Sequence, residues 1–185
     1  MKHYLLLFGV LLPTFLFAQK KICIQTLHST LVFSVGTDHR LYQTYFGKEL
    51  SAASIAGLSA GEGVESYLTA GGHNLFSPAI RMVHSDGNPS LELRVTDDTT
   101  IKVDEDRSTT RITMKDPVYP VTVQLCFSVY YREDVIKSWM EVTQEEREPV
   151  RLYNFASSML HFQAGSYWLT QFHGDFAEEM HRQED

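Results

Sequence analysis

The stretch YPVTVQLCFSVYY, from Tyr119 to Tyr131, alternates apolar and polar side chains along its length. Successive side chains of a β-strand point to opposite faces of the sheet, so this pattern predicts a half-buried strand. The face predicted to enter the core carries Val121, Val123, Leu125, Phe127 and Val129. The run therefore favours a fold whose sheets bury one face and expose the other.

The same period of two recurs along the rest of the chain. Shorter alternations lie at Thr30 to Val35, Leu41 to Tyr45, Leu91 to Val95, Arg111 to Lys115, Ile136 to Val142 and Tyr167 to Phe172. Turn-forming residues cluster at Ser85 to Pro89, Thr96 to Thr100, Asp104 to Ser108 and Glu145 to Pro149. We predict an all-β fold, a two-layer antiparallel β-sandwich of about ten or more strands.

One segment interrupts this rhythm. Residues 48–78 are rich in Ala, Ser and Gly and show no sustained alternation. An irregular stretch of this length in a compact domain is usually functional or mobile. We expect a short helical turn at Ala52 to Leu58 and no second domain boundary.

Residues 1–18 predict a secretory signal peptide, because Lys2 precedes an apolar run from Tyr4 to Phe17 and Ala18 offers a cleavage site. The apolar run is short for a membrane span. We expect residues 19–185 to form one domain of an exported protein, periplasmic or secreted. Cleavage removes one positive charge, so the formal net charge goes from −7 to −8 with His neutral. This charge disfavours nucleic acid and anionic membranes as partners, whereas a neutral ligand such as a sugar fits it better.

Export would permit a disulfide between Cys23 and Cys126. The alternation around each residue places both thiols on the more polar face of their strands. Pairing requires neighbouring strands with closely spaced Cα atoms, which the sequence does not reveal, so the free and the bridged forms both remain open. The chain has no CxxC motif and no Cys and His cluster at zinc spacing, so we expect no metal and no other cofactor.

Candidate catalytic groups are few, and each has a structural interpretation. His173, Gly174 and Asp175 place an imidazole and a carboxylate two residues apart, as in an acid-base pair or two metal ligands. This spacing is common by chance, Gly174 indicates a turn and no third ligand is near, so we favour a structural role. Ser157 and Ser158 lack the glycine-flanked nucleophile elbow of an α/β-hydrolase, and we expect ordinary strand residues. The acidic residues mostly occur as neighbours in predicted turns, which is typical of solvated loops.

The two tryptophans lie in predicted strands. Trp139 shares a face with Lys137 and Glu141. An indole on such a polar face either stacks on a sugar ring or is covered by another part of the protein, and we favour the cover. Trp168 lies in a strand that is partly apolar on both faces, which indicates burial between the sandwich and another element.

Four blocks of sequence resemble one known family, in the same order. They are DHRLYQTYFGKEL (residues 38–50), HSDGNPSLELRV (84–95), KDPVYPVTVQLCFSVYYREDVIKSWMEV (115–142) and LYNFASSMLHFQAGSYWLTQFHGDFAEEM (152–180). These blocks resemble the amino-terminal domain of bacterial α-galactosidases of glycoside hydrolase family 36. The resemblance extends from about Leu31 to Met180.

The resemblance implies a β-supersandwich that precedes a (β/α)8 barrel, with both catalytic aspartates in the barrel. The chain would then be a non-catalytic fragment of a retaining α-galactosidase, with the catalytic barrel absent, and residues 167–179 would form a strand and an exit loop. Its implied partners are its own missing catalytic barrel, the α-galactoside substrate of the intact enzyme and, in a homo-oligomer, a neighbouring subunit.

The resemblance further implies that a sandwich loop reaches the galactose pocket and supplies an acidic contact to the sugar. Segment 48–78 is the natural place for this loop. The residues expected near the substrate are Glu62, Glu65, His73 and Asn74, with Glu49 as a further acidic candidate. The residues expected to face the barrel are Trp139, Trp168, His173, Asp175 and Phe176, the last at a position where family members commonly have Trp.

Two classes of function remain open at this point. The first is a partial α-galactosidase that supports the barrel and covers its sugar pocket. The second is a stand-alone exported carbohydrate-binding or interaction module. A barrel encoded after Asp185 would indicate the first and a stop codon the second, and the charged ending HRQED, without a closing strand, favours the first.

Overall fold

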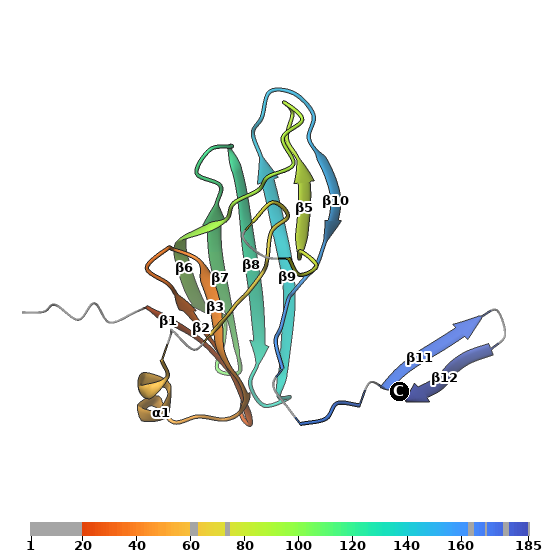
Figure 1. The fold of residues 1–185 in the computed structure, drawn as a ribbon. Coiled ribbons are helices and arrows are strands. Elements are labelled where there is room, and N and C mark those ends of the chain that lie inside the picture. The colour runs from red at the N-terminus through yellow and green to blue at the C-terminus, as the bar shows by residue number, and fades with distance from the viewer. Residues whose placement is uncertain are drawn as a thin grey trace, which may run out of the picture.

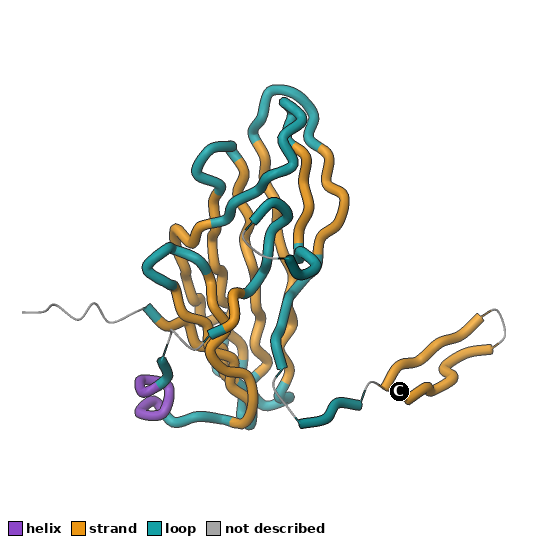
Figure 2. Tube along the Cα trace, viewed as in Figure 1, coloured by secondary structure: helices purple, strands orange, loops and turns teal. Residues whose placement is uncertain are grey.

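A computed structural model describes residues 20–59, 63–72, 75–162, 165–168, 170–175 and 178–184. Strands dominate these residues, and α1 (Ala52–Gly57) is the one helix among them (Figures 1 and 2). Every pair of neighbouring strands in the sheets is antiparallel. The all-β antiparallel fold predicted from the sequence is confirmed, and the predicted signal peptide lies outside the described residues.

The first sheet contains β1 (Lys21–Gln25), β2 (Ser29–Val35), β3 (Leu41–Lys48) and β4 (Val64–Glu65), in that order. Helix α1 lies between β3 and β4, where the side chain of Ser51 accepts a hydrogen bond from the Ser54 amide at 3.2 Å. This contact satisfies one of the free amides at a helix start. The short helical turn expected in the irregular segment is therefore confirmed.

The second sheet contains β6 (Arg94–Lys102), β7 (Arg107–Lys115), β8 (Val121–Tyr130) and β9 (Val135–Gln144), in that order. Strand β8 is the stretch on which the sequence prediction began, and it pairs with β7 on one side and β9 on the other. Two smaller sheets pair β5 (Ile80–Val83) with β10 (Arg151–Phe155), and β11 (Thr170–Asp175) with β12 (Glu178–Glu184).

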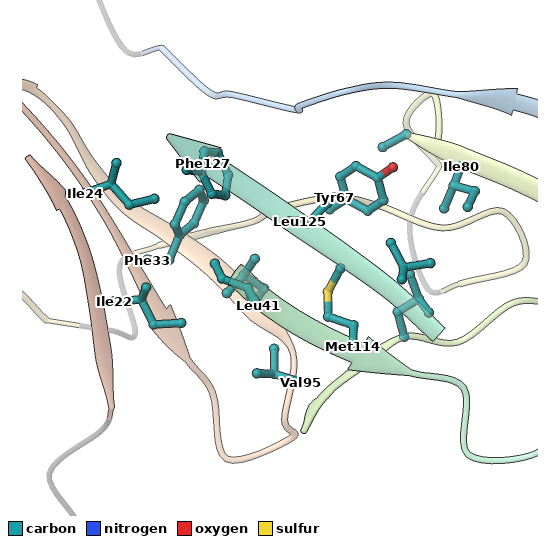
Figure 3. Close-up of a cluster of buried hydrophobic side chains, with 14 of the residues drawn as sticks. Ile22, Ile24, Phe33, Leu41, Tyr67, Ile80, Val95, Met114, Leu125 and Phe127 are labelled. Carbon is teal, nitrogen blue, oxygen red and sulfur yellow. The ribbon is translucent and has the colours of Figure 1, made fainter. Parts of the chain in front are cut away.

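The core lies between the β1–β4 sheet and the inner face of the β6–β9 sheet (Figures 1 and 3). The five apolar residues predicted on one face of β8 are all buried, each at most 3% exposed. Phe33 of β2 points toward Phe127 of β8, and their ring centroids are 5.5 Å apart (Figure 3). The two sheets thus interlock through side chains that the period of two identified.

Two local predictions around β6 are wrong, and the backbone hydrogen bonds explain both. A strand was predicted from Leu91, but β6 begins at Arg94. The Leu91 amide donates to the Ala70 carbonyl at 3.1 Å and the Glu92 amide donates to the Asp116 carboxylate at 2.8 Å, so neither amide pairs with a neighbouring strand. The predicted turn at Thr96 to Thr100 lies inside β6, paired with β7 after a register shift. The chain reverses later, at residues 104–106, and an exposed edge strand tolerates Asp and Thr side chains.

The C-terminal part also differs from the prediction. Residues 178–184, expected as an exit loop and charged tail, form β12 and pair with β11. Strand β11 begins at Thr170, later than the predicted Tyr167. Ser157 and Ser158 follow the end of β10 in a loop and are not strand residues. Charged sequences of this kind form strands when a neighbouring strand supplies the backbone partners.

The two cysteines are free. Cys23 of β1 is exposed, whereas Cys126 of β8 is buried on the outer face of its sheet. Burial raises the pKa of both thiols, which keeps them protonated. The disulfide left open by the sequence does not form in this structure.

Candidate functional site

The irregular segment is firmly anchored before its tip. Tyr67 and Leu68 are 3% and 2% exposed, and the Tyr67 hydroxyl donates to the Ala156 carbonyl at 2.9 Å. Thr69 forms a parallel bridge with Ile80, and the Ala70 amide donates to the Ile80 carbonyl at 3.1 Å. The chain therefore leaves the core at residue 70 and returns to it at residue 80, which defines a loop of residues 71–78.

A glycine is required where this loop leaves the core. Gly71 has a φ of +85°, a conformation that other residues rarely adopt. A Cβ atom at this position would lie 2.7 Å from the Cα atom of Ser90. The loop base is thus pressed against the segment that leads into β6.

The described part of the 71–78 loop has two exposed apolar side chains. Leu75 is fully exposed and Phe76 is 74% exposed. Large apolar side chains grouped on a surface mark a contact site for a partner. The expected substrate-proximal residues Glu62, His73 and Asn74 lie outside the described residues.

Glu65, the fourth residue expected near the substrate, belongs to a charge cluster around Arg40. The Arg40 guanidinium is 12% exposed and contacts the Glu65 carboxylate at 2.7 Å and the Glu92 carboxylate at 3.4 Å. It also lies 3.8 Å from Asp38. Arg40 thus holds the Glu65 carboxylate beside β3. The one positive guanidinium neutralises part of the negative charge of Asp38, Glu65 and Glu92. Glu49 lies elsewhere, exposed, with the Gln25 amide at 3.5 Å.

A cavity of about 220 Å³ lies beside the base of the loop. Its wall is formed by Gly71 and Gly72 of the loop, the Arg40 side chain, Glu92 and Tyr119 among others. Asp116 also lines it, but its carboxylate oxygens accept hydrogen bonds from the amides of Glu92, Val118 and Tyr119. The charged groups of the cavity are thus held by internal partners, which favours a supporting role over acid-base chemistry.

A buried hydrogen-bonded pair, His84 and Glu146, lies behind the Tyr119 side of this wall. The His84 side chain is fully buried, the Glu146 side chain is 4% exposed, and His84 Nδ1 lies 2.7 Å from Glu146 Oε1. The His84 ring stacks on Tyr119 with centroids 3.5 Å apart. Burial acts to raise the pKa of the Glu146 carboxyl, but hydrogen bonds from His84 and the Ser85 amide outweigh it, and the pKa lies below its ordinary value. The pair fastens the β9–β10 loop to the turn after β5.

Low pH is expected to weaken the contact between His84 and Glu146 and to lower the stability of the domain. A carboxyl whose pKa is lowered in the folded state contributes stability that is present above its unfolded pKa and is lost as the pH falls through the folded value. We expect the melting temperature to fall more steeply below about pH 4.3 in the wild type than in Glu146→Gln. Thermal melts from pH 6 to pH 3 measure this difference. Glu145→Gln, at the exposed neighbour, serves as the control and should follow the wild type; equal slopes for wild type and Glu146→Gln would contradict the assignment.

A second candidate surface includes β10 and the described residues after it. The described part of residues 152–172, here named the aromatic segment, has many exposed apolar side chains: Leu152, Tyr153, Phe155, Phe162, Tyr167, Trp168 and Phe172. All five residues of β10 are exposed, although the strand pairs with β5. Trp168 is 78% exposed, so the burial expected for it does not occur within this chain.

The other residues expected to face the barrel, as far as the structure describes them, lie in two places. His173 and Asp175 lie in β11, and Phe176 lies outside the described residues. Trp139 lies on the outer face of the β6–β9 sheet and is half-buried by its own neighbours. The described residues of this group, His173, Asp175 and Trp139, thus belong to two different sheets.

Arg40 and the His84–Glu146 pair were not predicted from the sequence. Each depends on partners 25 to 62 residues apart in the chain, so no local spacing reveals it. The available signal was indirect, since Arg40 and His84 lie in two of the blocks that carry the family resemblance.

Neither a metal site nor a membrane-spanning helix is present among the described residues. They contain no group of three or more His, Cys, Asp or Glu side chains placed to hold a metal ion. No helix in the described part of the chain has the length and apolar character needed to cross a membrane.

The fold places the chain among antiparallel β-sandwich domains with one long irregular insertion. Residues 39–185 match the glycosyl hydrolase family 36 N-terminal domain. The chain belongs to this family, as the resemblance indicated. No curated protein sequence matches the chain.

Solved structures with the same fold include several α-galactosidases. The α-galactosidase from Lactobacillus brevis superposes with a TM-score of 0.77 at 19% identity, over 91% of this chain and 27% of that protein. The galactosidase domain of the α-galactosidase-sucrose kinase AgaSK gives a TM-score of 0.77 at 17% identity, over 90% of this chain and 28% of that protein. A variant of the family 36 α-galactosidase AgaA from Geobacillus stearothermophilus, in complex with raffinose, gives a TM-score of 0.75 at 15% identity. The match covers 89% of this chain and 28% of that protein. The chain thus spans about a quarter of the length of these proteins.

Proposed function

We propose that this chain is the non-catalytic amino-terminal domain of an exported, retaining α-galactosidase, and that it supports a catalytic (β/α)8 barrel and helps to close the sugar pocket of that barrel. Membership of the family supports the assignment as an amino-terminal domain, and the names of the structural relatives supply the substrate class. Export is proposed from the leader-like sequence of residues 1–18. The observation that carries the second part is the 71–78 loop, which is anchored in the core yet ends in the exposed Leu75 and Phe76.

The charges of the described cavity support a non-catalytic role. Retaining glycosidases need two carboxyl groups about 5 Å apart, one ionised as nucleophile and one protonated as acid. In the cavity, Glu92 is paired with Arg40 and Asp116 accepts three backbone amides. Both carboxylates are therefore held by partners within the domain, and this arrangement favours a supporting role over chemistry on a bound sugar.

The aromatic segment is the surface proposed to meet the barrel. Its exposed rings, from Tyr153 to Phe172, would be removed from water by a second domain. Contact there would leave the 71–78 loop free to reach the pocket. In a homo-oligomer the pocket reached would belong to the same or to a neighbouring subunit.

The loop tip gives the sharpest test of this function. In a protein that joins this chain to its catalytic barrel, Leu75→Ser combined with Phe76→Ser should lower kcat/KM for a chromogenic α-galactoside at least about tenfold. Burial of one or two such side chains contributes about 1.5–3 kcal/mol each, and about 1.4 kcal/mol corresponds to a factor of ten. Steady-state kinetics, with the melting temperature measured alongside, separates a contact at the pocket from a loss of folding.

Two controls accompany this experiment. Val103→Ser changes another exposed apolar residue, which directly follows β6 and does not line the cavity, and should leave kcat/KM unchanged. The 185-residue chain alone should show no turnover above a buffer blank. Activity that copurifies with the isolated chain, or full activity in the double variant, would refute the proposed roles.

A further inference from the structure

The outer face of the β6–β9 sheet is a polar platform around Trp139. The inner face packs in the core, and the outer face points away from the β1–β4 sheet (Figure 1). The backbone register places Arg111, Cys126 and Trp139 in one row across β7, β8 and β9. The next row contains Thr113, Gln124 and Glu141.

Small side chains form the floor of this platform. Cys126 is fully buried and Ser128 is 8% exposed, although both lie on the outer face of β8. The larger side chains of the flanking strands lie above them, with Arg111 exposed on β7 and Trp139 half-buried on β9. Neighbouring strands are about 4.8 Å apart, so Arg111 and Trp139 are separated by about 10 Å across the sheet. This separation suits a ligand of two or more sugar units.

The indole of Trp139 is held in place by its neighbours. Its N–H donates to Glu141 Oε1 at 3.0 Å, which fixes the orientation of the ring. The Lys137 ammonium lies 5.6 Å from the ring centroid, over one face. Lys137 is exposed, so its flexible side chain can swing into solvent and uncover this face.

Charged groups of both signs surround the indole. Arg111 and Lys137 are positive, Glu141 is negative, and Gln124 is neutral with its amide directed to Thr113 at 3.2 Å. A polycation would meet repulsion at Arg111 and Lys137, and a polyanion would meet repulsion at Glu141. A neutral polyhydroxyl ligand uses donors and acceptors together, and its apolar ring faces stack on an aromatic side chain.

We propose that this platform is a binding site for neutral oligosaccharides, separate from the 71–78 loop, with Trp139 as the stacking surface. Arg111, Gln124 and Glu141 hydrogen-bond to the hydroxyl groups, and Lys137 is displaced from the ring. The site goes beyond the proposed function, because it would hold a glycan on the sandwich itself rather than at the pocket of a catalytic domain.

Saturation-transfer NMR with stachyose as the probe tests the site on the 185-residue chain. We expect transfer to the sugar in the wild type, and an affinity at least about tenfold weaker in Trp139→Ala, which corresponds to about 1.4 kcal/mol of lost contact. Lys137→Ala uncovers the ring and should bind more tightly than the wild type. Trp168→Ala, which removes the other tryptophan, and Phe76→Ser, in the loop, should both bind as the wild type does.

The outcomes distinguish the platform from other sites. Equal binding by the wild type and Trp139→Ala would overturn the proposal, as would absence of transfer in the wild type or a preference for an anionic oligogalacturonide over stachyose. If circular dichroism shows that Trp139→Ala does not fold, Arg111→Ala and Glu141→Gln take its place, and both must weaken binding. Loss of binding in Phe76→Ser alone would assign the sugar to the loop, which would refute the platform and leave the proposed function intact.

Discussion

Replacing Phe127 by Ala is expected to lower the free energy of unfolding by about 3–5 kcal/mol, which is the usual cost of removing a buried phenylalanine. Phe127 is 3% exposed at the middle of β8, and its ring packs against Phe33 of the opposite sheet. The substitution removes this ring contact between the two sheets and leaves a cavity. Strand β8 is hydrogen-bonded to β7 and β9, so it cannot easily move to close the cavity. A loss of this size is a large part of the stability of a single domain.

A denaturant titration of the isolated chain measures the effect, and Thr122→Ala is the matched control. Thr122 lies on the same strand but on the outer face, where it is partly exposed. Its truncation removes little buried surface, so we expect a loss below about 1 kcal/mol. Similar losses for the two variants would show that the face of β8 was assigned wrongly.

The period of two predicted the buried face of β8 because that signal is local. Alternate side chains of one strand share a face, whatever the rest of the chain does. The buried Ile22 and Ile24 of β1, on either side of the exposed Cys23, follow the same rule. Sheet class and core composition could therefore be predicted from the sequence.

Strand ends were predicted less well, since they depend on where each backbone amide finds an acceptor. Leu91 and Leu93 alternate like strand residues and are buried, yet the Leu91 amide bonds to a loop carbonyl 21 residues earlier in the chain. Asp97 and Asp98 have turn chemistry, but β7 supplies ladder partners for both. In each case a tertiary partner determined the structure against the local preference.

The candidate site depended almost wholly on long-range contacts. Sequence reasoning located the irregular segment and its family resemblance, but the base of the loop is fixed by Tyr67, Ile80 and Ser90, which no periodic pattern connects. Glu65 was proposed as a sugar contact because it is acidic. The structure shows that the same charge holds Arg40, whose guanidinium is largely buried and needs a partner.

The isolated chain is expected to self-associate and to bind a hydrophobic dye through its aromatic segment. Monomeric domains rarely leave large apolar patches uncovered, and here Tyr153, Phe155 and Trp168 are 60%, 64% and 78% exposed. Strand β10 adds to this tendency, because within the described part of the chain it pairs only with β5, and all of its residues are exposed. An open strand edge beside exposed rings is a template for pairing with another chain.

Light scattering and dye fluorescence over a range of protein concentrations measure this behaviour. The triple variant Tyr153→Ser, Phe155→Ser and Trp168→Ser should remain monomeric and lose most of the dye signal, while Val118→Ser, at an exposed residue of another loop, should behave as the wild type. Joining the chain to its catalytic barrel should suppress association without any substitution, because the barrel would then cover the segment. A wild-type chain that stays monomeric at high concentration and binds no dye would show that these rings are not a contact surface, and the proposed support of the barrel would lose its structural basis.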